Sequence, residues 1–240
     1  MPDALEKKLL GEVHGHKVFQ VDGGQVRKNI NEEFTNWAAH WDHPGVVPQG
    51  EVWIDKGAHP AEIPIFVDRA IKEGRLAQGG HMAPEKVREA GDRYEEAERQ
   101  KIFGSLVAGK NLAGHPGVRE VPVAHDPGSE PSNRVRLVLV DGEQIRNGPD
   151  PQHENFTEGG NHGPYKWIPR NEIWLEQGMQ PSELGLTALH ELHERRQMLG
   201  AGASYGHAHR SASIVEHYAR ENPHLLPAML RAEIAANDRV

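Results

Sequence analysis

The sequence predicts an α+β protein made of two copies of one ββ-loop-β-α-α unit, packed together as a pseudo-dimer. Two observations support this fold class. Residues 21–27 (VDGGQVR) recur as 140–146 (VDGEQIR), and residues 51–57 (EVWIDKG) recur as 172–178 (EIWLEQG), the latter at an offset of 121 residues (172 minus 51). Strand-like and helix-like patterns also follow each other in the same order in both halves. A copy of roughly 90 residues has the size of a small domain.

The repeats set the expected domain boundaries. The first repeat covers 1–103 and is expected to be a degenerate copy, whereas the second covers 134–240 and is expected to hold a metal site. Residues 104–133 are rich in Gly, Pro and Ser, a composition typical of linkers. Neither copy has enough apolar sequence for a large core, so we expect the two to pack against each other.

The elements of each copy are predicted from turn signals and hydrophobic spacing. Residues 1–11 read as a short polar helix or arm. Each copy then opens with a β-hairpin whose two-residue turn is Asp-Gly, at 22–23 and 141–142, a sequence preferred in type I′ turns. The later elements have matched ranges: a polar loop at 28–50 and 147–170, a strand at 51–55 and 172–176, a first helix at 60–78 and 181–199, and a second helix at 84–103 and 204–221. A last helix is expected over 223–237.

Composition narrows the class of protein. The net charge of −8 argues against nucleic-acid binding, because that function relies on a basic surface. The chain has no cysteine, which excludes disulfides, thiolate nucleophiles and Cys-ligated zinc. No stretch reaches the ~18 apolar residues of a membrane span, and the N-terminus lacks the apolar core of a signal peptide. We therefore expect a cytoplasmic protein without nucleic-acid or membrane partners, and homo-oligomerisation stays open.

Chemistry is concentrated in one segment, HELHE, within the helix expected over 181–199. His190 and Glu194 are four residues apart, so their side chains stack on one face of a helix. His193 can also converge with His190, at a spacing of three. Imidazole and carboxylate groups at one-turn spacing are typical zinc ligands. The choice between His193 and Glu194 as the second ligand stays open.

The next helix supplies further candidate ligands. Its stripe of small apolar residues lets it approach the HELHE helix closely, and His209 and Glu216 lie in the neighbouring stripe. An antiparallel pair of helices would bring His209 or Glu216 opposite His190 and Glu194. The small apolar stripe consists of Ala208, Ala212, Val215 and Ala219.

The first copy gives an internal comparison, in which only Glu194 keeps its identity. At the offset of 121, the pairs are His190 with Arg69, Glu191 with Ala70, His193 with Lys72 and Glu194 with Glu73; after a further shift of three residues, they are His209 with Glu85 and Glu216 with Asp92. The scaffold residues survive in both copies. The split therefore favours a functional site in the second copy and structural support in the first.

A strand followed by a helix that carries His-Glu, with a later helix supplying another ligand, is similar to the zincin metallopeptidases. The resemblance covers residues 172–216. It implies that His190 is the first zinc ligand, Glu191 the general base, and His209 or Glu216 the third ligand. Glu194 stands where the family has its second histidine, so the motif is HExxE instead of HExxH. Residues 173–175 take the place of the edge strand that holds the substrate backbone.

The sequence thus predicts a zinc-dependent hydrolase that acts on a peptide or amide bond, with a peptide or a small molecule as substrate; other divalent metals stay open. A metal ion with an open position polarises a carbonyl and activates water, and Glu191 takes the proton. The chain also resembles small bacterial and phage proteins that carry an ELHE-containing helix. The alternative function is accordingly a non-catalytic metal-binding or structural protein of bacterial or phage origin.

Two other interpretations of HELHE compete with the metal site. It can be a solvated helix face in which Glu191 pairs with Arg195, and Glu194 with Arg195 or Arg196. Paired helices also build di-iron sites from Glu-x-x-His motifs, although the order here is His-x-x-His-Glu.

The segment FTEGGNHGPYKW is a second candidate, because it can lend Glu158 or His162 to a metal cleft. A plain loop is favoured, since His40 holds the place of His162 in the first copy. Trp53 and Trp174 recur in the short strand and are predicted to anchor the core.

Overall fold

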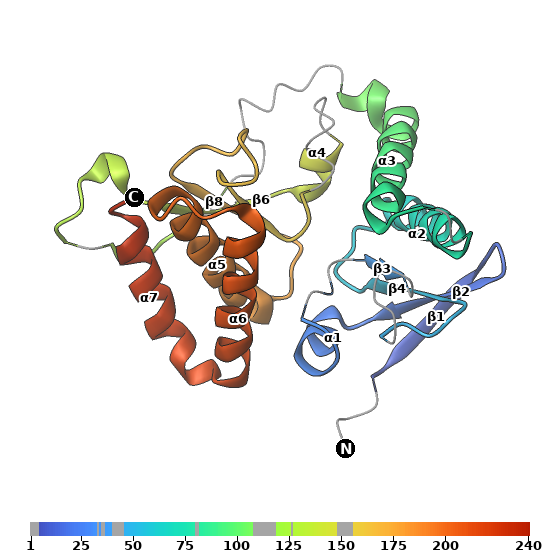
Figure 1. Cartoon of the computed structure of the whole chain (residues 1–240), viewed down its shortest axis with the longest axis horizontal. Helices are drawn as coiled ribbons and strands as arrows, with labels where there is room; N and C mark the ends of the chain where they lie inside the picture. Colours follow the sequence, from blue (N-terminus) through green and yellow to red (C-terminus); the bar gives the residue numbers. More distant parts are fainter. Residues whose placement is uncertain are drawn as a thin grey trace. The chain divides into compact units, whose positions relative to one another are not determined.

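The computed structural model describes residues 5–32, 34, 37–39, 46–79, 82–107, 119–125, 127–147 and 156–240. The chain divides into two compact units, both drawn in Figure 1. The first unit comprises Met1–Gly114 with Glu143–Thr157, and the second comprises His115–Gly142 with Glu158–Val240. The described residues 143–147, which fall within the predicted second repeat, are thus grouped with the first unit.

The first unit contains a four-stranded sheet of order β1-β2-β4-β3. β1 (Lys7–Val13) and β2 (His16–Val21) form an antiparallel hairpin, β2 runs parallel to β4 (Glu51–Asp55), and β3 (Trp37–Ala39) pairs antiparallel with β4. The hairpin turn is His14-Gly15, in which both residues have a positive φ and the second is a glycine. A helix or arm over 1–11 is therefore wrong from Lys7 onward, because that segment pairs along β2.

The predicted Asp-Gly hairpin turns are wrong, because both Asp-Gly pairs begin helices. Asp22 caps α1 (Gly23–Asn29), and its Oδ1 accepts a hydrogen bond from the Gln25 N–H at 3.1 Å. Asp141 likewise precedes α4 (Gly142–Arg146). Aspartate is favoured both in tight turns and at helix N-caps, so the dipeptide alone does not choose between the two structures.

Two helices complete the first unit, α2 (Ile63–Gln78) and α3 (Pro84–Val107). Apolar side chains of α2 pack against those of β2 and β4 in one buried cluster: Val18, Val52, Ile54, Ala58, Phe66, Val67, Ala70 and Ile71. Trp53 is buried in a second cluster with Val21, Val26, Phe34 and Val47, as predicted for a core anchor.

The second unit contains a sheet with the same strand order and the same directions of pairing, β5-β6-β8-β7. β5 (Arg119–Val121) and β6 (Arg136–Val140) are antiparallel, β6 is parallel to β8 (Glu172–Glu176), and β7 (Gly159–Asn161) is antiparallel to β8. A 3₁₀ turn, η2 (Pro131–Asn133), precedes β6. Both β5 and η2 lie within the segment that was expected to be a linker.

The structure corrects the expected edge strand. Residues 173–175 lie in β8, which is internal because β6 and β7 flank it. The edge strand beside β8 is β7, which has the sequence Gly-Gly-Asn, and residues of this kind are depleted in strands. Trp174 in β8 is buried, as predicted for a core anchor.

Three helices of the second unit lie side by side (Figure 1). α5 (Pro181–Arg195) continues into a π-helical turn, η4 (Arg196–Gly200), and α6 (Tyr205–Glu221) packs against α5. α7 (Leu226–Asn237) follows the 3₁₀ turn η5 (Pro223–Leu225) and also packs against α5. Of the stripe predicted on α6, Ala208, Ala212 and Ala219 are buried and Val215 is half-buried, and Leu186, Leu189 and Leu192 are buried on α5. Because alanine side chains are small, α5 and α6 approach closely enough for polar side chains to meet between them.

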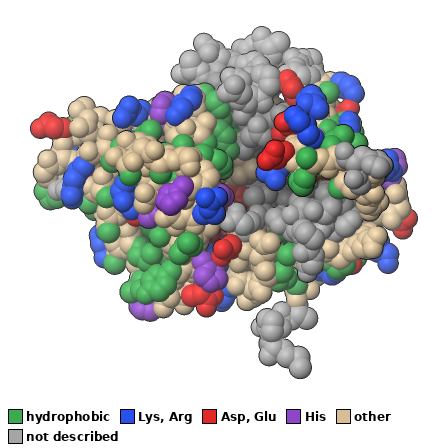
Figure 2. Space-filling model, viewed as in Figure 1, with side chains coloured by type: hydrophobic (Ala, Val, Ile, Leu, Met, Phe, Trp, Pro, Cys, Tyr) green, Lys and Arg blue, Asp and Glu red, His purple; other side chains and the backbone are tan. Residues whose placement is uncertain are grey.

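Charged side chains are distributed without a dominant sign on the face drawn in Figure 2, where basic, acidic and histidine side chains are scattered among one another. Among the described residues, no helix combines the length and the hydropathy needed to cross a lipid bilayer.

Candidate metal centre

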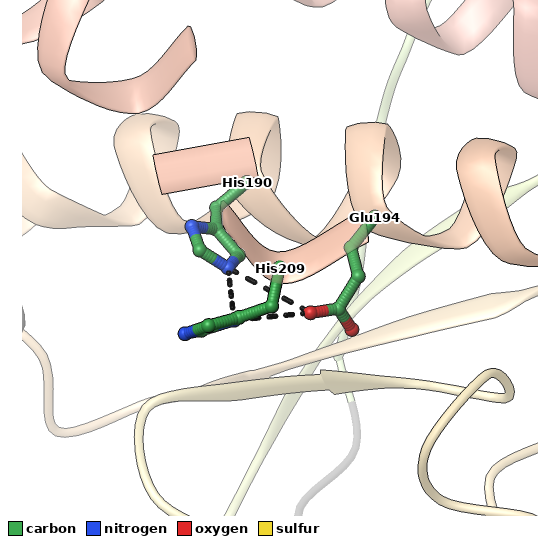
Figure 3. Close-up of side chains that lie close together, drawn as sticks. All are labelled: His190, Glu194 and His209. Atoms are coloured by element: carbon green, nitrogen blue, oxygen red, sulfur yellow. Dashed lines mark hydrogen bonds and ion pairs between the residues drawn. The ribbon is translucent and has the colours of Figure 1, made fainter. Parts of the chain in front are cut away.

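Three side chains from α5 and α6 converge on one point (Figure 3). His190 and Glu194 lie one turn apart on α5, and His209 reaches them from α6. His209 Nδ1 lies 3.1 Å from His190 Nε2 and 3.1 Å from Glu194 Oε2. The third side of the triangle, from His190 Nε2 to Glu194 Oε2, measures 3.9 Å. The predicted one-turn spacing on α5 therefore places both side chains toward the same partner.

The three residues differ in their access to solvent. Glu194 is 2% exposed and His190 is 9% exposed, whereas the side chain of His209 keeps 34% of its surface accessible. The rings of His190 and His209 meet edge to face at 4.9 Å, and Tyr205 stacks on His209 at 5.4 Å. The cluster is therefore closed on the side of α5 and reachable on the side of His209.

The orientation of His190 is fixed from behind by Glu216. Glu216 Oε2 lies 2.9 Å from His190 Nδ1, and Arg220 donates to the other oxygen of Glu216 at 2.7 Å. Arg220 in turn forms two 3.0 Å hydrogen bonds with Glu183. Burial disfavours the charged ring of His190, but the hydrogen bond with Glu216 and the negative charges of Glu191 and Glu216 outweigh burial and raise the pKa of His190. Burial likewise opposes ionisation of Glu216, and hydrogen bonds from His190 and Arg220 lower its pKa overall.

Sequence reasoning missed Asn161, which lies in the edge strand β7. Its Nδ2 donates to Glu194 Oε1 and to Glu191 Oε2, both at 2.8 Å. The Gly163 N–H donates to Asn161 Oδ1 at 2.7 Å, which fixes which end of the amide faces the two carboxylates. Asn161 is fully buried. The available sequence signal was that Asn161 aligns with Ala39 at the offset that pairs His40 with His162 in the predicted repeat.

Glu191 shares the amide of Asn161 with Glu194 and lies beside the triangle. Burial, together with the neighbouring Glu194 carboxylate, raises the pKa of Glu191 to about 7. Gly159 is required here, because a Cβ at that position would lie 2.7 Å from Thr187 Cγ2 and 3.0 Å from Glu191 Cγ. Gly159 thus allows the backbone of the edge strand to approach α5.

The three facing atoms need a proton or a cation among them. Because His190 donates its Nδ1 proton to Glu216, its neutral ring presents an acceptor at Nε2. A single proton on His209 Nδ1 then serves both His190 Nε2 and Glu194 Oε2. A divalent cation in the same place would displace that proton and meet three lone pairs.

Two of the predicted ligands lie outside this triangle. Glu216 contacts His190 from the far side of the ring, as described above. His193 points toward α7 and α6, where its Nδ1 lies 2.8 Å from Glu233 and its Nε2 lies 2.9 Å from Ser211 Oγ. The structure therefore brings together His190, Glu194 and His209, and leaves His193 in a separate cluster.

The predicted salt-bridged face of HELHE is wrong. Arg195 donates to the Arg170 carbonyl and to Asn237, and Arg196 pairs with Glu233. Within the described part of the chain, no ion pair joins either arginine to Glu191 or Glu194. The carboxylates of α5 instead face Asn161 and His209.

The second candidate segment contributes differently from expectation. The ring of His162 lies 2.8 Å from the Ile168 carbonyl, within its own loop. The backbone carbonyl of Glu158 accepts a hydrogen bond from the Glu176 N–H. His40, which holds the equivalent place, lies outside the described residues. The segment is thus partly the edge strand β7, and Asn161 is its residue beside the triangle.

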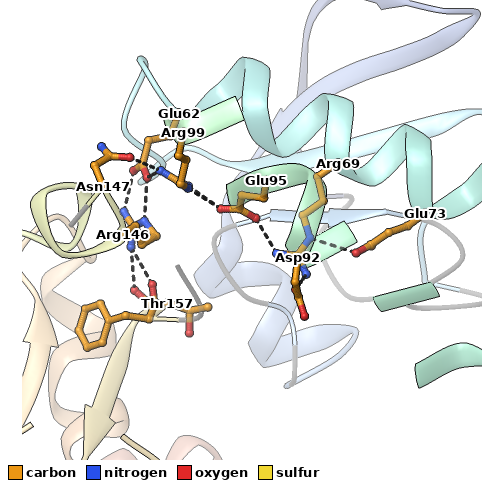
Figure 4. Close-up of polar contacts among 10 residues, drawn as sticks. Glu62, Arg69, Glu73, Asp92, Glu95, Arg99, Arg146, Asn147 and Thr157 are labelled. Atoms are coloured by element: carbon orange, nitrogen blue, oxygen red, sulfur yellow. Dashed lines mark hydrogen bonds and ion pairs between the residues drawn. The ribbon is translucent and has the colours of Figure 1, made fainter. Parts of the chain in front are cut away.

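A charged cluster of the first unit offers a comparison (Figure 4). Arg69 of α2 donates to Glu73 at 3.0 Å, to Glu95 at 2.5 Å and to Asp92 at 2.6 Å. Glu95 also accepts hydrogen bonds from Arg99 at 2.6 and 2.8 Å. Here a guanidinium group neutralises carboxylates that come from two packed helices.

No family model, curated protein or solved structure matches this chain.

Proposed function

We propose that His190, Glu194 and His209 bind a divalent metal ion, most readily zinc, and that the protein is a zinc-dependent hydrolase of peptide or amide bonds. The observation that carries the metal site is the triangle of 3.1, 3.1 and 3.9 Å formed by their donor atoms. The hydrolase rests on that site together with the position of Glu191.

The dimensions of the triangle fit zinc. With Zn–N and Zn–O bonds of about 2.0–2.1 Å, two ligands of a tetrahedral site are roughly 3.3 Å apart. The circle through His190 Nε2, His209 Nδ1 and Glu194 Oε2 has a radius of about 2.0 Å, so an ion close to their plane can reach all three at bonding distance. Two imidazoles and one carboxylate form the donor set of many catalytic zinc sites, which keep a fourth position open.

The surrounding hydrogen bonds support the same proposal. Ligating histidines usually donate their second ring N–H to a carboxylate, as His190 does to Glu216. Asn161 holds Glu194 Oε1 and thereby directs Oε2 toward the two imidazoles. These contacts hold two of the three donors in place before any ion arrives, which lowers the cost of ordering them.

A comparison with the first unit supports a cation at the proposed site. Several contacts recur there at the offset of 121: Trp53 with Glu51 as Trp174 with Glu172, Arg99 with Glu62 as Arg220 with Glu183, and Arg99 with Glu95 as Arg220 with Glu216. We include in this proposal that the two units are copies of one another. The correspondence continues without the three-residue shift expected from the sequence, so Glu216 corresponds to Glu95 instead of Asp92.

In that correspondence, Arg69 takes the place of His190. Its guanidinium group contacts Glu73 and Glu95, the counterparts of Glu194 and Glu216. The first unit thus carries a permanent cation where the second has an imidazole. The proposed metal ion restores in the second unit the positive charge that arginine supplies in the first.

Glu191 is the proposed proton acceptor. A metal ion with an open position supplies Lewis acidity and lowers the pKa of bound water. Glu191 shares the Asn161 amide with the ligand Glu194, which places its carboxylate beside the cluster. Its role is to take a proton from the attacking water and to deliver it to the leaving amine.

The metal site is tested by competitive zinc titration of the wild-type protein against a chromophoric chelator. We expect one tight site per chain, lost on His209→Ala and retained on His207→Ala, which removes an exposed histidine of the same helix. Equal affinity in the wild type and in His209→Ala would place the zinc elsewhere. No binding at all would leave the single shared proton as the only occupant and would end the proposal.

The hydrolase is tested separately with zinc-loaded protein and a fluorescently labelled casein. We expect cleavage that stops on chelation and returns with zinc. Glu191→Gln should keep the zinc and lose at least a hundredfold in rate, within the range of general acid–base catalysis. Zinc binding without cleavage of casein or of N-acylated anilides would reduce the function to metal binding without catalysis.

A further inference from the structure

A second cluster in the same unit has the connectivity of a serine-histidine-acid triad. Ser211 Oγ lies 2.9 Å from His193 Nε2, and His193 Nδ1 lies 2.8 Å from Glu233 Oε1. Both distances are within the hydrogen-bond reach expected of an activated nucleophile, its base and the group that orients the base. The three residues come from α6, α5 and α7, so three packed helices hold them.

The ionisation of Glu233 determines which atoms donate in the two hydrogen bonds of His193. Arg196 donates to both oxygens of Glu233, at 2.7 and 2.9 Å, and anchors its carboxylate. Burial opposes ionisation, but hydrogen bonds from His193 and Arg196 lower the pKa of Glu233 to about 2. An ionised carboxylate only accepts, so the proton of the neutral His193 ring is on Nδ1 and Nε2 is the acceptor. The Ser211 hydroxyl therefore donates to Nε2, the arrangement in which a histidine removes a proton from a serine.

The surroundings provide access and one further donor. Ser211 is half-buried, whereas His193 is 6% exposed, so the serine is more accessible to solvent than the base. The Gln197 amide nitrogen lies 3.3 Å from His193 Nε2, on the side of the ring that faces Ser211. Gln197 belongs to the π-helical turn η4, an irregularity that is frequent at functional sites.

We infer that Ser211, His193 and Glu233 form a second, metal-independent site that transfers acyl groups from activated esters to Ser211. In the first step, Ser211 Oγ bonds to the ester carbonyl carbon, and the hydroxyl proton passes to His193 Nε2. The carbon–oxygen bond to the leaving alcohol then breaks, and His193 returns the proton to that oxygen. Water then bonds to the acyl carbon as His193 takes its proton, the bond from that carbon to Ser211 Oγ breaks, and His193 returns the proton to Oγ, which releases the carboxylic acid and restores the hydroxyl.

The experiment uses an alkyl fluorophosphonate, which forms an oxygen–phosphorus bond with an activated serine and releases fluoride. The full chain is incubated with excess chelator, and the adduct is located by intact mass and peptide mass spectrometry. We expect one adduct per chain, on Ser211, absent in Ser211→Ala and at least a hundredfold slower in His193→Gln. Ser213→Ala, which removes the other serine of α6, should react like the wild type.

Chelation removes any zinc from the proposed metal site, so the result does not depend on that site. No adduct in the folded wild-type chain, or an adduct that persists in Ser211→Ala, overturns the inference. Ser211→Cys guards against loss of fold, since the chain has no other cysteine. Its alkylation by iodoacetamide should be at least tenfold faster than that of the Ser211→Cys/His193→Gln double variant, and equal rates also overturn it.

Discussion

Replacing Glu191 by glutamine in the metal-free protein is expected to increase the free energy of unfolding at alkaline pH. Burial and the Glu194 carboxylate raise the pKa of Glu191 from 4.5 to about 7. The folded protein therefore holds this proton more tightly than the unfolded chain does. The stability that the group contributes is complete below pH 4.5, falls as the pH rises toward 7, and is lost above 7. Glutamine stays neutral throughout, so the variant keeps the stability that the wild type loses when Glu191 ionises.

The pKa difference corresponds to about 3 kcal/mol at alkaline pH, and solvent access to the half-buried side chain reduces this to about 2 kcal/mol. The assay is urea unfolding of both proteins with chelator at about pH 4, 6 and 8. All other groups titrate in both proteins, so the difference between them isolates Glu191. The advantage of Glu191→Gln should be near zero at the lowest pH and largest at the highest. A constant difference across the range, or a variant less stable than the wild type at pH 8, would show that folding does not raise the pKa of Glu191.

Three further substitutions test the hydrogen bonds around the proposed metal site and the ion pairs of the first unit. Glu216→Gln removes the carboxylate behind His190 and should weaken zinc binding by about 10- to 100-fold in a competitive titration. An unchanged zinc affinity would show that Glu216 does not orient His190 for binding. Asn161→Ala releases Glu194 and should weaken zinc binding by about tenfold, as measured in the same way; an equal or tighter affinity contradicts this role. Arg69→Met leaves the buried carboxylates of the first unit without a cation and should lower the free energy of unfolding by about 3–5 kcal/mol in urea, while zinc affinity stays unchanged; a loss below about 1 kcal/mol contradicts the ion-pair argument.

Elements with strong periodicity were predictable from the sequence, and short or ambiguous ones were not. The strands at 51–55 and 172–176 have the bounds that were expected, because each is an apolar run that ends at turn residues. The Asp-Gly pairs were misassigned, since the same dipeptide suits a turn and a helix start. The sequence did not predict β7, because glycine has no preference for strands and only the pairing with β8 makes this segment a strand.

The sequence predicted which site residues share a helix, but it did not predict which residues of other elements they meet. The spacing of His190 and Glu194 on one helix placed them together, as the structure has them. Choosing among His209, Glu216 and His193 required the rotation of α6 about α5, which spacing alone does not determine. Asn161 escaped because its contact with Glu194 spans 33 residues of sequence and depends on how the edge strand passes α5.

The most direct test of the proposed metal centre is zinc K-edge X-ray absorption on protein loaded with one equivalent of zinc. For the proposed site we expect about four nitrogen and oxygen ligands at about 2.0–2.1 Å, with the outer-shell scattering of two imidazoles. His209→Ala should no longer hold the zinc, so the imidazole scattering should be lost, and His207→Ala should leave it unchanged. A spectrum of the wild type with no imidazole, or one unaffected by His209→Ala, would contradict a site built from His190, Glu194 and His209.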